Sequence, residues 1–229
     1  MFHEGFTQQH RTLGRFAAWT VFFLMVAYAV VTVMGLLSLK SPEDPIVDPF
    51  FTLMELLIVL IVPFMLIVMI AVHAYAAPEA KAYSFTALVF MIVLTGITST
   101  VHFVVLTVSR QIQAAGLAAA PLFFSFTWPS VAYTTDILAW DWFFALSMLF
   151  AALVFKQNGL EGSVRILMIV SGVLSLVGLV GVLLADVGVE NWFIYRDIGI
   201  IGYSLVATVV FLLLGILFGH NQPAPAQTG

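Results

Sequence analysis

The stretch Phe50–Ala76, FFTLMELLIVLIVPFMLIVMIAVHAYA, decides the fold class of this chain. It is almost entirely apolar, and Glu55 is its only formally charged side chain. A helix needs about 20 apolar residues to cross the hydrocarbon core of a bilayer. The stretch is longer than that, so it predicts a membrane-spanning helix.

The rest of the chain repeats this pattern. Hydrophobic residues make up 62% of the sequence and charged residues only 9%, whereas soluble domains carry about 25% charged residues. Composition and length therefore predict an all-α, polytopic membrane bundle of six transmembrane helices. The other five predicted spans are Leu13–Leu39, Ala82–Ser109, Ser130–Phe155, Val164–Ala185 and Ile198–Phe218.

Loop charge predicts how the bundle sits in the membrane. If the N-terminus is cytoplasmic, the inner side holds more Lys and Arg than the outer side, which favours both termini inside. We therefore predict a cytoplasmic segment over 1–12, a transmembrane domain over 13–219, and a disordered Pro- and Gln-rich tail over 220–229. The expected location is the cell membrane. The apolar segment 111–128 is too short for a span and is interpreted as interfacial or re-entrant.

Several cofactors and partners are excluded by the residues present. The chain has no cysteine, so no Fe–S cluster is expected. A bis-histidine haem needs two histidines at one depth, but His73 and His102 lie at opposite ends of their spans. All lysines lie at span ends, which argues against a retinal Schiff base. The mild net charge of −4 argues against a nucleic-acid partner.

Ionisable residues inside the spans are the strongest functional signal. At a rise of 1.5 Å per residue, they gather in the outer half of four different helices. Charges in lipid cost a few kcal/mol or more, so they normally face the bundle interior or a wet cavity. We therefore predict an outward-opening polar pocket between spans two, three, four and six. The residues of this set, with one phenol, are Glu55, His102, Asp136, Asp141, Arg196 and Tyr203.

The third span carries a polar edge in the sequence TGITSTVHFVVLTVSRQ, Thr95–Gln111. Thr95, Ser99 and His102 follow a spacing of i, i+4 and i+7, which places them on one helix face. Thr98 adds to the same side. Apolar residues such as Val101 occupy the opposite positions. This spacing predicts that the polar edge faces the pocket and the valines face lipid.

The fourth span, in WPSVAYTTDILAWDWFFALSM, holds Asp136 and Asp141. Five residues of a regular helix advance about 500°, so the two carboxylates point about 140° apart unless the helix is distorted. We predict that Asp141, the deeper one, faces the core. Asp136 is expected to face the outer loops or a neighbour such as Arg196. Trp140 lies one turn from Asp136.

The start of the sixth span places Arg196, Gly199 and Tyr203 on one face. Arg196 and Tyr203 are expected to orient an anionic head group or to hold a buried carboxylate through paired hydrogen bonds. Small residues such as Gly178 in span five and Gly199 are interpreted as sites of close helix packing.

Three classes of function remain open. The first is an enzyme that acts on a lipid-like or membrane-embedded substrate by acid–base or metal-assisted chemistry. The second is a proton- or cation-coupled transporter, and the third is a non-catalytic ligand-binding or assembly module. A buried network that only fixes helix register is the structural alternative.

In the enzyme hypothesis, the catalytic residues are His102, Glu55 and Asp141, which would also be the ligands if a divalent metal is bound. Membrane lipid and a small molecule or cation are the expected partners, and in the transporter hypothesis a homo-oligomer, as a homodimer, could supply the second half of the transporter. The expected substrate-binding residues are Arg196, Tyr203, Asp136, Thr98, Ser99 and Trp140.

Overall fold

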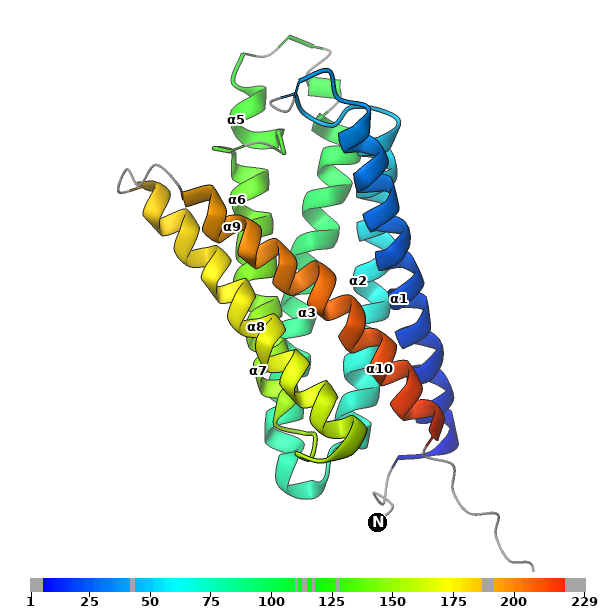
Figure 1. Cartoon of the computed structure of the whole chain (residues 1–229). Coiled ribbons are helices and arrows are strands. Elements are labelled where there is room, and N and C mark those ends of the chain that lie inside the picture. Colours follow the sequence, from blue (N-terminus) through cyan, green and yellow to red (C-terminus); the bar gives the residue numbers. More distant parts are fainter. Residues whose placement is uncertain are drawn as a thin grey trace, which may run out of the picture.

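The computed structural model describes residues 6–41, 44–109, 111–112, 115–116, 118–126, 128–186 and 192–220, and the fold is stated for these residues. Six helical stretches within them are long and apolar enough to cross a membrane, which confirms the predicted all-α bundle (Figure 1). These spans are Gln8–Leu37, Phe50–Tyr75, Pro78–Ser109, Val131–Ala152, Gly159–Leu184 and Ile194–His220. The chain is therefore a multi-pass integral membrane protein. The orientation with both termini inside stays a prediction. The predicted disordered tail lies outside the described residues, apart from His220 at the end of the last helix.

The first three spans are nearly regular helices. The elements are α1 (Gln8–Leu37), α2 (Phe50–Tyr75), a short 3₁₀ turn η1 (Pro78–Ala80), α3 (Lys81–Val104), and a π-helical turn η2 (Val105–Ser109).

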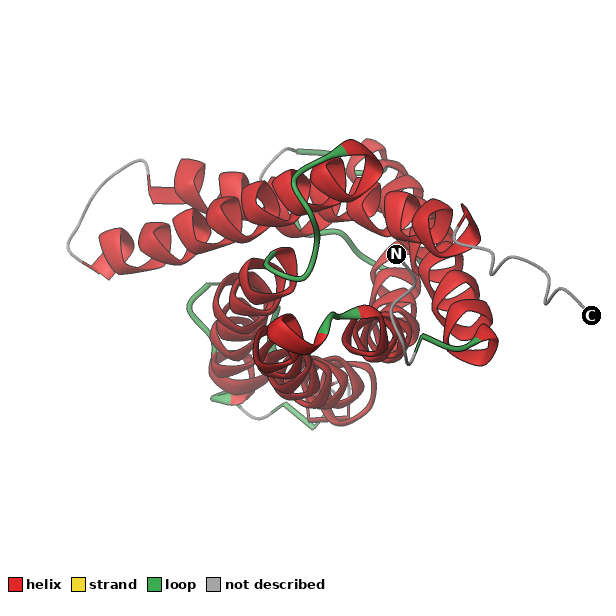
Figure 2. Cartoon of the chain, turned by 90° about the horizontal axis from the view of Figure 1, so that it is seen from below, coloured by secondary structure: helices red, strands yellow, loops and turns green. Residues whose placement is uncertain are grey.

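Spans four and six are divided into shorter segments, whereas span five is one continuous helix. These three spans begin after a short helix, α5, in the segment that was interpreted as interfacial or re-entrant. The elements are α5 (Ala120–Phe124), α6 (Val131–Ile137), π-helical η3 (Leu138–Phe144), α7 (Ala145–Ala152), α8 (Gly159–Asp186), α9 (Trp192–Ile201), π-helical η4 (Gly202–Val206) and α10 (Ala207–His220). Figure 2 shows helices joined by short loops throughout the described chain.

The first helix begins earlier than the apolar pattern predicts. Thr7 caps it: the backbone N–H of His10 donates to Thr7 Oγ1 at 3.3 Å, and the Thr7 N–H donates to His10 Nδ1 at 3.3 Å. This reciprocal pair satisfies backbone donors that a helix start leaves open. As a result, part of the predicted 1–12 segment is helical, and α1 extends beyond the predicted span by more than one turn.

The spans pack as a ring in chain order. α1 packs on α2, α2 on α3, α3 on α7, α7 on α8, and α8 on α9, and α10 closes the ring by packing along α1. The start of α1 and the end of α10 therefore lie side by side at the lower end of the bundle in Figure 1, which we call the terminal end. The other end is called the distal end.

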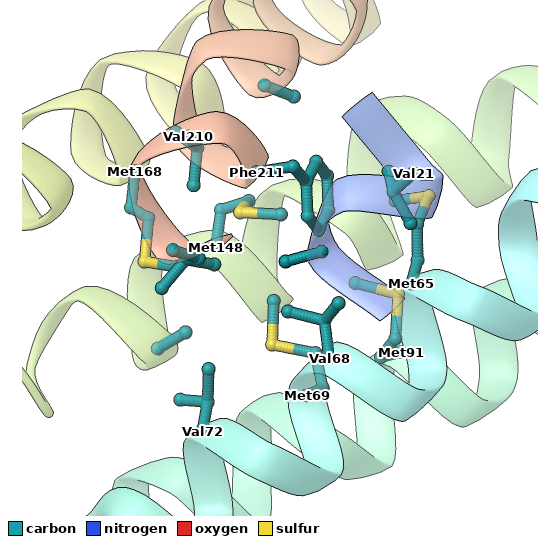
Figure 3. Close-up of a cluster of buried hydrophobic side chains, with 14 of the residues drawn as sticks. Val21, Met65, Val68, Met69, Val72, Met91, Met148, Met168, Val210 and Phe211 are labelled. Carbon is teal, nitrogen blue, oxygen red and sulfur yellow. The ribbon is translucent and has the colours of Figure 1, made fainter. Parts of the chain in front are cut away.

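The terminal half of the ring is filled with apolar side chains. Figure 3 shows methionines from several helices, among them Met65, Met91, Met148 and Met168, meeting Phe211 at the centre. These side chains are fully buried or nearly so. Methionine is unbranched and adapts to irregular gaps, so the six helices close on a dry core here. This core fixes the frame on which the polar residues of the distal half are held.

Candidate functional site

The first cluster of the site joins three helices through one imidazole. His102, near the end of α3, places Nδ1 2.7 Å from Glu55 Oε2 on α2 and Nε2 3.3 Å from Asp136 Oδ1 on α6. All three side chains are buried. Both contacts need a hydrogen, so the cluster carries two protons between the imidazole and the carboxyl groups. Because both ring nitrogens are occupied, the imidazole is held in a single orientation.

The second cluster is an ion pair on spans four and six. Arg196 Nη1 on α9 donates to Asp141 Oδ1 at 2.9 Å and to Oδ2 at 2.8 Å, and Nη2 donates to the Tyr203 hydroxyl at 2.9 Å. Asp141 is fully buried. The guanidinium carbon lies 5.8 Å from the Tyr133 ring centroid and 5.5 Å from the Tyr203 centroid. Arg196 is thus neutralised by a carboxylate and enclosed by aromatic rings.

Two glycines make room for the Asp141 carboxylate. A Cβ added at Gly178 on α8 would lie 2.8 Å from the Gly199 Cα and 3.1 Å from Asp141 Oδ2. A Cβ added at Gly199 would lie 2.7 Å from the Gly178 Cα. The prediction that these glycines mark close helix packing is confirmed. Their second effect, a space for a buried carboxylate between α8 and α9, was not predicted.

The pairing of the two aspartates differs from the sequence interpretation. Asp141 is in the core, as predicted, but Asp141 holds Arg196 while Asp136 contacts His102. The reason is local: η3, Leu138–Phe144, is π-helical and lies between the two carboxylates. Its wider turn pairs residues five apart, so the regular 100° advance does not apply. The predicted separation of 140° between the two carboxylates applied only to a regular helix, and this helix is distorted.

Each π-helical turn of the described chain lies on a helix that contributes to this site. η2 directly follows the His102 turn, η3 separates Asp136 from Asp141, and η4 carries Tyr203. Such turns re-aim side chains and are frequent at functional sites.

A cavity of about 470 Å³ lies beside both clusters. Its polar wall is formed by His102, Asp136, Arg196, Tyr133 and Tyr203, whereas Glu55 and Asp141 are outside the lining, behind His102 and Arg196. His102 and Arg196, the two basic groups of the lining, are therefore each backed by a buried carboxylate. The predicted pocket between spans two, three, four and six also includes span one, which contributes Met25, Tyr28, Ala29, Thr32 and Val33.

The rest of the cavity wall is mostly apolar and reaches the outer surface of the bundle. The exceptions are the hydroxyl-bearing side chains Tyr28, Thr32, Ser204 and Thr208. Val33 on α1 and Ile201 and Leu205 on span six line the cavity and are exposed. α1 packs closely along α10 but has no comparable packing against α9, and Figure 1 shows α9 leaning away from α1 toward the distal end. The cavity rim thus lies between α1 and span six, on a side of the bundle that faces lipid in a membrane.

The third span only partly follows its predicted polar edge. Thr98 is fully buried, Ser99 is half-buried, and Thr95 Oγ1 donates to the Val62 carbonyl of α2 at 3.3 Å. Val101, expected to face lipid, is buried instead. The reason is that α3 packs between α2 on one side and α6, η3 and α7 on the other. Its buried arc is therefore wider than one polar stripe.

Two aromatic residues close to the site, Phe126 and Tyr28, were not singled out from the sequence. Phe126, in the segment after α5, lies with its ring centroid 5.2 Å from that of His102, and Tyr28 lines the cavity from α1. Trp140 lines the cavity as well, 5.2 Å from Tyr203 between ring centroids. Phenols carry no charge, so the cost argument that found the carboxylates did not point to them.

The predicted metal set is not assembled. Asp141 is bonded to Arg196, away from the Glu55 and His102 pair. Among the described residues, no group of three or more His, Asp or Glu side chains is arranged to hold a metal ion. The site therefore offers hydrogen bonds, proton exchange and aromatic faces.

The chain matches no protein-family model, no curated protein and no solved structure. The fold defines a class of protein, a six-helix membrane bundle with a cavity that is polar at one end. The chemistry of that cavity indicates which functions are possible.

Proposed function

We propose that this protein binds an amphipathic molecule dissolved in the membrane and acts on its polar head by acid–base chemistry. One observation carries the proposal: the cavity of about 470 Å³ has ionisable groups at one end, mostly apolar walls, and a rim of exposed apolar side chains between α1 and span six. A volume of this size suits a small-molecule ligand. The rim offers a path for an apolar chain that never leaves the bilayer.

The acid–base step is assigned to the His102 and Asp136 pair. Glu55 holds Nδ1 at 2.7 Å, while Nε2 and Asp136, 3.3 Å apart, line the cavity. An imidazole that is oriented by a carboxylate on one nitrogen and hydrogen-bonded through the other to a second carboxylate can pass a proton to or from that second carboxylate, which here lines the cavity. In this proposal Asp136 and His102 exchange a proton with the substrate head. Glu55 is a positioning residue.

Charge counting favours a head group that is cationic or neutral. The described residues of the two clusters include three carboxylates, one guanidinium and one imidazole. Even with a protonated imidazole, three negative groups against two positive ones leave one negative charge. Uncompensated buried charge costs several kcal/mol, so an added proton or a cation stabilises the cluster. An anionic head would add to the excess, although Arg196 lines the wall.

Binding can be tested through Trp140, which lines the cavity. The purified protein is titrated with alkyl amphiphiles brominated on the chain and carrying an ammonium, a hydroxyl or a carboxylate head. Bromine quenches nearby tryptophan, and the Trp140→Phe variant identifies the Trp140 component. We expect the ammonium and hydroxyl probes to quench it and the carboxylate probe to do so least. Ala29→Phe at the rim should reduce quenching, whereas Val30→Phe, outside the lining, should not. Equal quenching in both variants would contradict the proposed entry path.

Chemistry is tested separately from binding. Reconstituted protein is incubated with total membrane lipid extract in H₂¹⁸O or D₂O, and lipid products are followed by mass spectrometry. We expect labelled or mass-shifted product with the native chain and none with Asp136→Asn. Binding without any product would overturn the catalytic part and leave a binding function.

The charge count also supports a second candidate, proton- or cation-coupled transport across what we take to be the cell membrane. A cluster that is stabilised either by a proton or by a cation can exchange one for the other. Proteoliposomes under a pH gradient should then show cation flux that is lost in Asp136→Asn. Flux without lipid product would favour this candidate over the enzyme.

A further inference from the structure

A second hollow lies at the terminal end of the bundle, far from the polar cavity. It has a volume of about 360 Å³ and lies between the start of α1 and the end of α10. A smaller hollow of about 220 Å³ adjoins it and shares Arg15, Trp19 and Gly219. The larger hollow is lined by Gln8, Arg11, Thr12, Arg15, Phe16, Trp19, Phe218 and Gly219.

Within the described part of the chain, no partner explains the burial of Arg11. Its side chain is only 6% exposed, yet Nε and Nη1 are buried without a hydrogen-bond partner among the described residues. Its guanidinium carbon lies 6.0 Å from the Phe6 ring centroid, and no described carboxylate forms an ion pair with it. Unpaired buried charge is strongly unfavourable. An anion in the hollow, which Arg11 lines, would compensate this charge.

The surroundings of Arg11 add positive charge. Arg15 follows one turn later on the same face of α1, and the helix N-terminus contributes a partial positive charge. Arg15 lies beside the end of α10, where a Cβ at Gly219 would meet Arg15 Nε at 3.5 Å. That position lets Arg15 offset the negative end of the α10 dipole. Arg11 is then the cation left for a ligand.

The two ends of the hollow differ in polarity along the membrane normal. Trp19 lies eight residues beyond Arg11, which is about 12 Å along the helix. Phe16 and Trp19 line this inner part. The hollow therefore presents a guanidinium near the helix end and aromatic surface deeper in the bilayer. This order matches a phosphate head group followed by acyl chain, and basic pockets between spans bind such head groups.

We propose that this hollow binds the phosphate of an anionic phospholipid, with the Arg11 guanidinium as its counter-charge. The aromatic end receives the upper part of an acyl chain. The site is independent of the polar cavity, so it would stand whether the cavity is catalytic or not.

The test is native mass spectrometry of the full chain with phosphatidylglycerol and phosphatidylcholine supplied at equal concentration. We expect one tightly held phosphatidylglycerol, and loss of its affinity by about tenfold in Arg11→Gln, because the counter-charge of the phosphate is removed. Lys156→Gln is the matched control, because it removes an exposed positive charge from a loop at the same end. Equal loss in both variants, or no loss in Arg11→Gln, would overturn the site.

If Arg11→Gln fails to fold, Thr12→Asp provides a second test of anion binding in the hollow. Thr12 is exposed and lines the hollow, and a carboxylate near a helix start is favourable for folding. It should still repel a phosphate and lower phosphatidylglycerol affinity; unchanged affinity would contradict the proposal. Inorganic phosphate is the second arm. If it raises the unfolding midpoint as much as the lipid does, the lipid assignment is wrong.

Discussion

The terminal half of the bundle is filled with methionine, valine and phenylalanine, whereas every buried carboxylate of the described residues lies in the distal half (Figure 3). Both halves are made by the same six spans. In the terminal half the helices are regular and meet around Phe211. In the distal half three of them change to π-helical turns beside a cavity.

This difference separates stability from function. Lipid tails are as apolar as leucine, so helix association in a membrane depends on close packing and hydrogen bonds. The apolar core of the terminal half supplies close packing at no electrostatic cost, and the buried Arg11 lies outside that core, near the start of α1. The distal half keeps five ionisable groups that cost free energy to bury. Such groups are retained where a polar ligand must be met inside the bilayer. The division therefore supports a frame at one end and a binding site at the other.

The largest effect is expected at Asp141. Asp141→Leu leaves the Arg196 guanidinium buried without its carboxylate, and breaking a buried pair costs about 3–5 kcal/mol in the free energy of unfolding. The double variant Asp141→Leu with Arg196→Met should recover most of this loss, because no charge is then left unpaired. Chemical denaturation in mixed micelles measures both.

Met148→Leu is the matched variant in the terminal half. It conserves volume at a fully buried methionine, so it should cost less than about 1.5 kcal/mol. If Asp141→Leu costs no more than this, the two halves do not differ in the way described.

The sequence predicts the six membrane spans well, because the hydropathy and length of a segment decide whether it can cross a bilayer. The meeting of Glu55 and His102 could also be predicted, because charges on lipid-facing surfaces are too costly. The partner of each aspartate could not be predicted, because the π-helical turn between Asp136 and Asp141 leaves no signature in a 3.6-residue pattern. The contribution of Tyr28 on span one could not be predicted either, because its side chain is uncharged.

A smaller loss of stability is expected when a methyl group is added at the contact between α8 and α9. In Gly178→Ala the new methyl group would lie 2.8 Å from the Gly199 backbone and 3.1 Å from Asp141 Oδ2. Overpacking of this kind costs about 1–3 kcal/mol. The same substitution at Gly96 on α3, where nothing lies within 4 Å, should leave stability unchanged or raise it by up to about 1 kcal/mol through helix propensity. Thermal unfolding of the two variants in one detergent compares them directly, and equal midpoints would mean that α8 and α9 are not in close contact.

The smallest effect concerns the boundary between the two halves. Thr98 lies one turn from His102 toward the terminal end, is fully buried, and has a hydroxyl without a partner among the described residues. An unsatisfied buried hydroxyl costs free energy, so Thr98→Val should raise the free energy of unfolding by about 1 kcal/mol. Denaturant titration can detect a change of this size.

Thr95→Val is the control, and we expect it to lower the free energy of unfolding, whereas Thr98→Val should raise it. The Thr95 hydroxyl donates to the Val62 carbonyl across the α2–α3 contact at 3.3 Å, so its removal should cost about 0.5–1.5 kcal/mol. If Thr98→Val also destabilises the protein, its hydroxyl is bonded to water. The wet region would then extend one helical turn below His102, toward the dry core around Met91, and the boundary between frame and site would move with it.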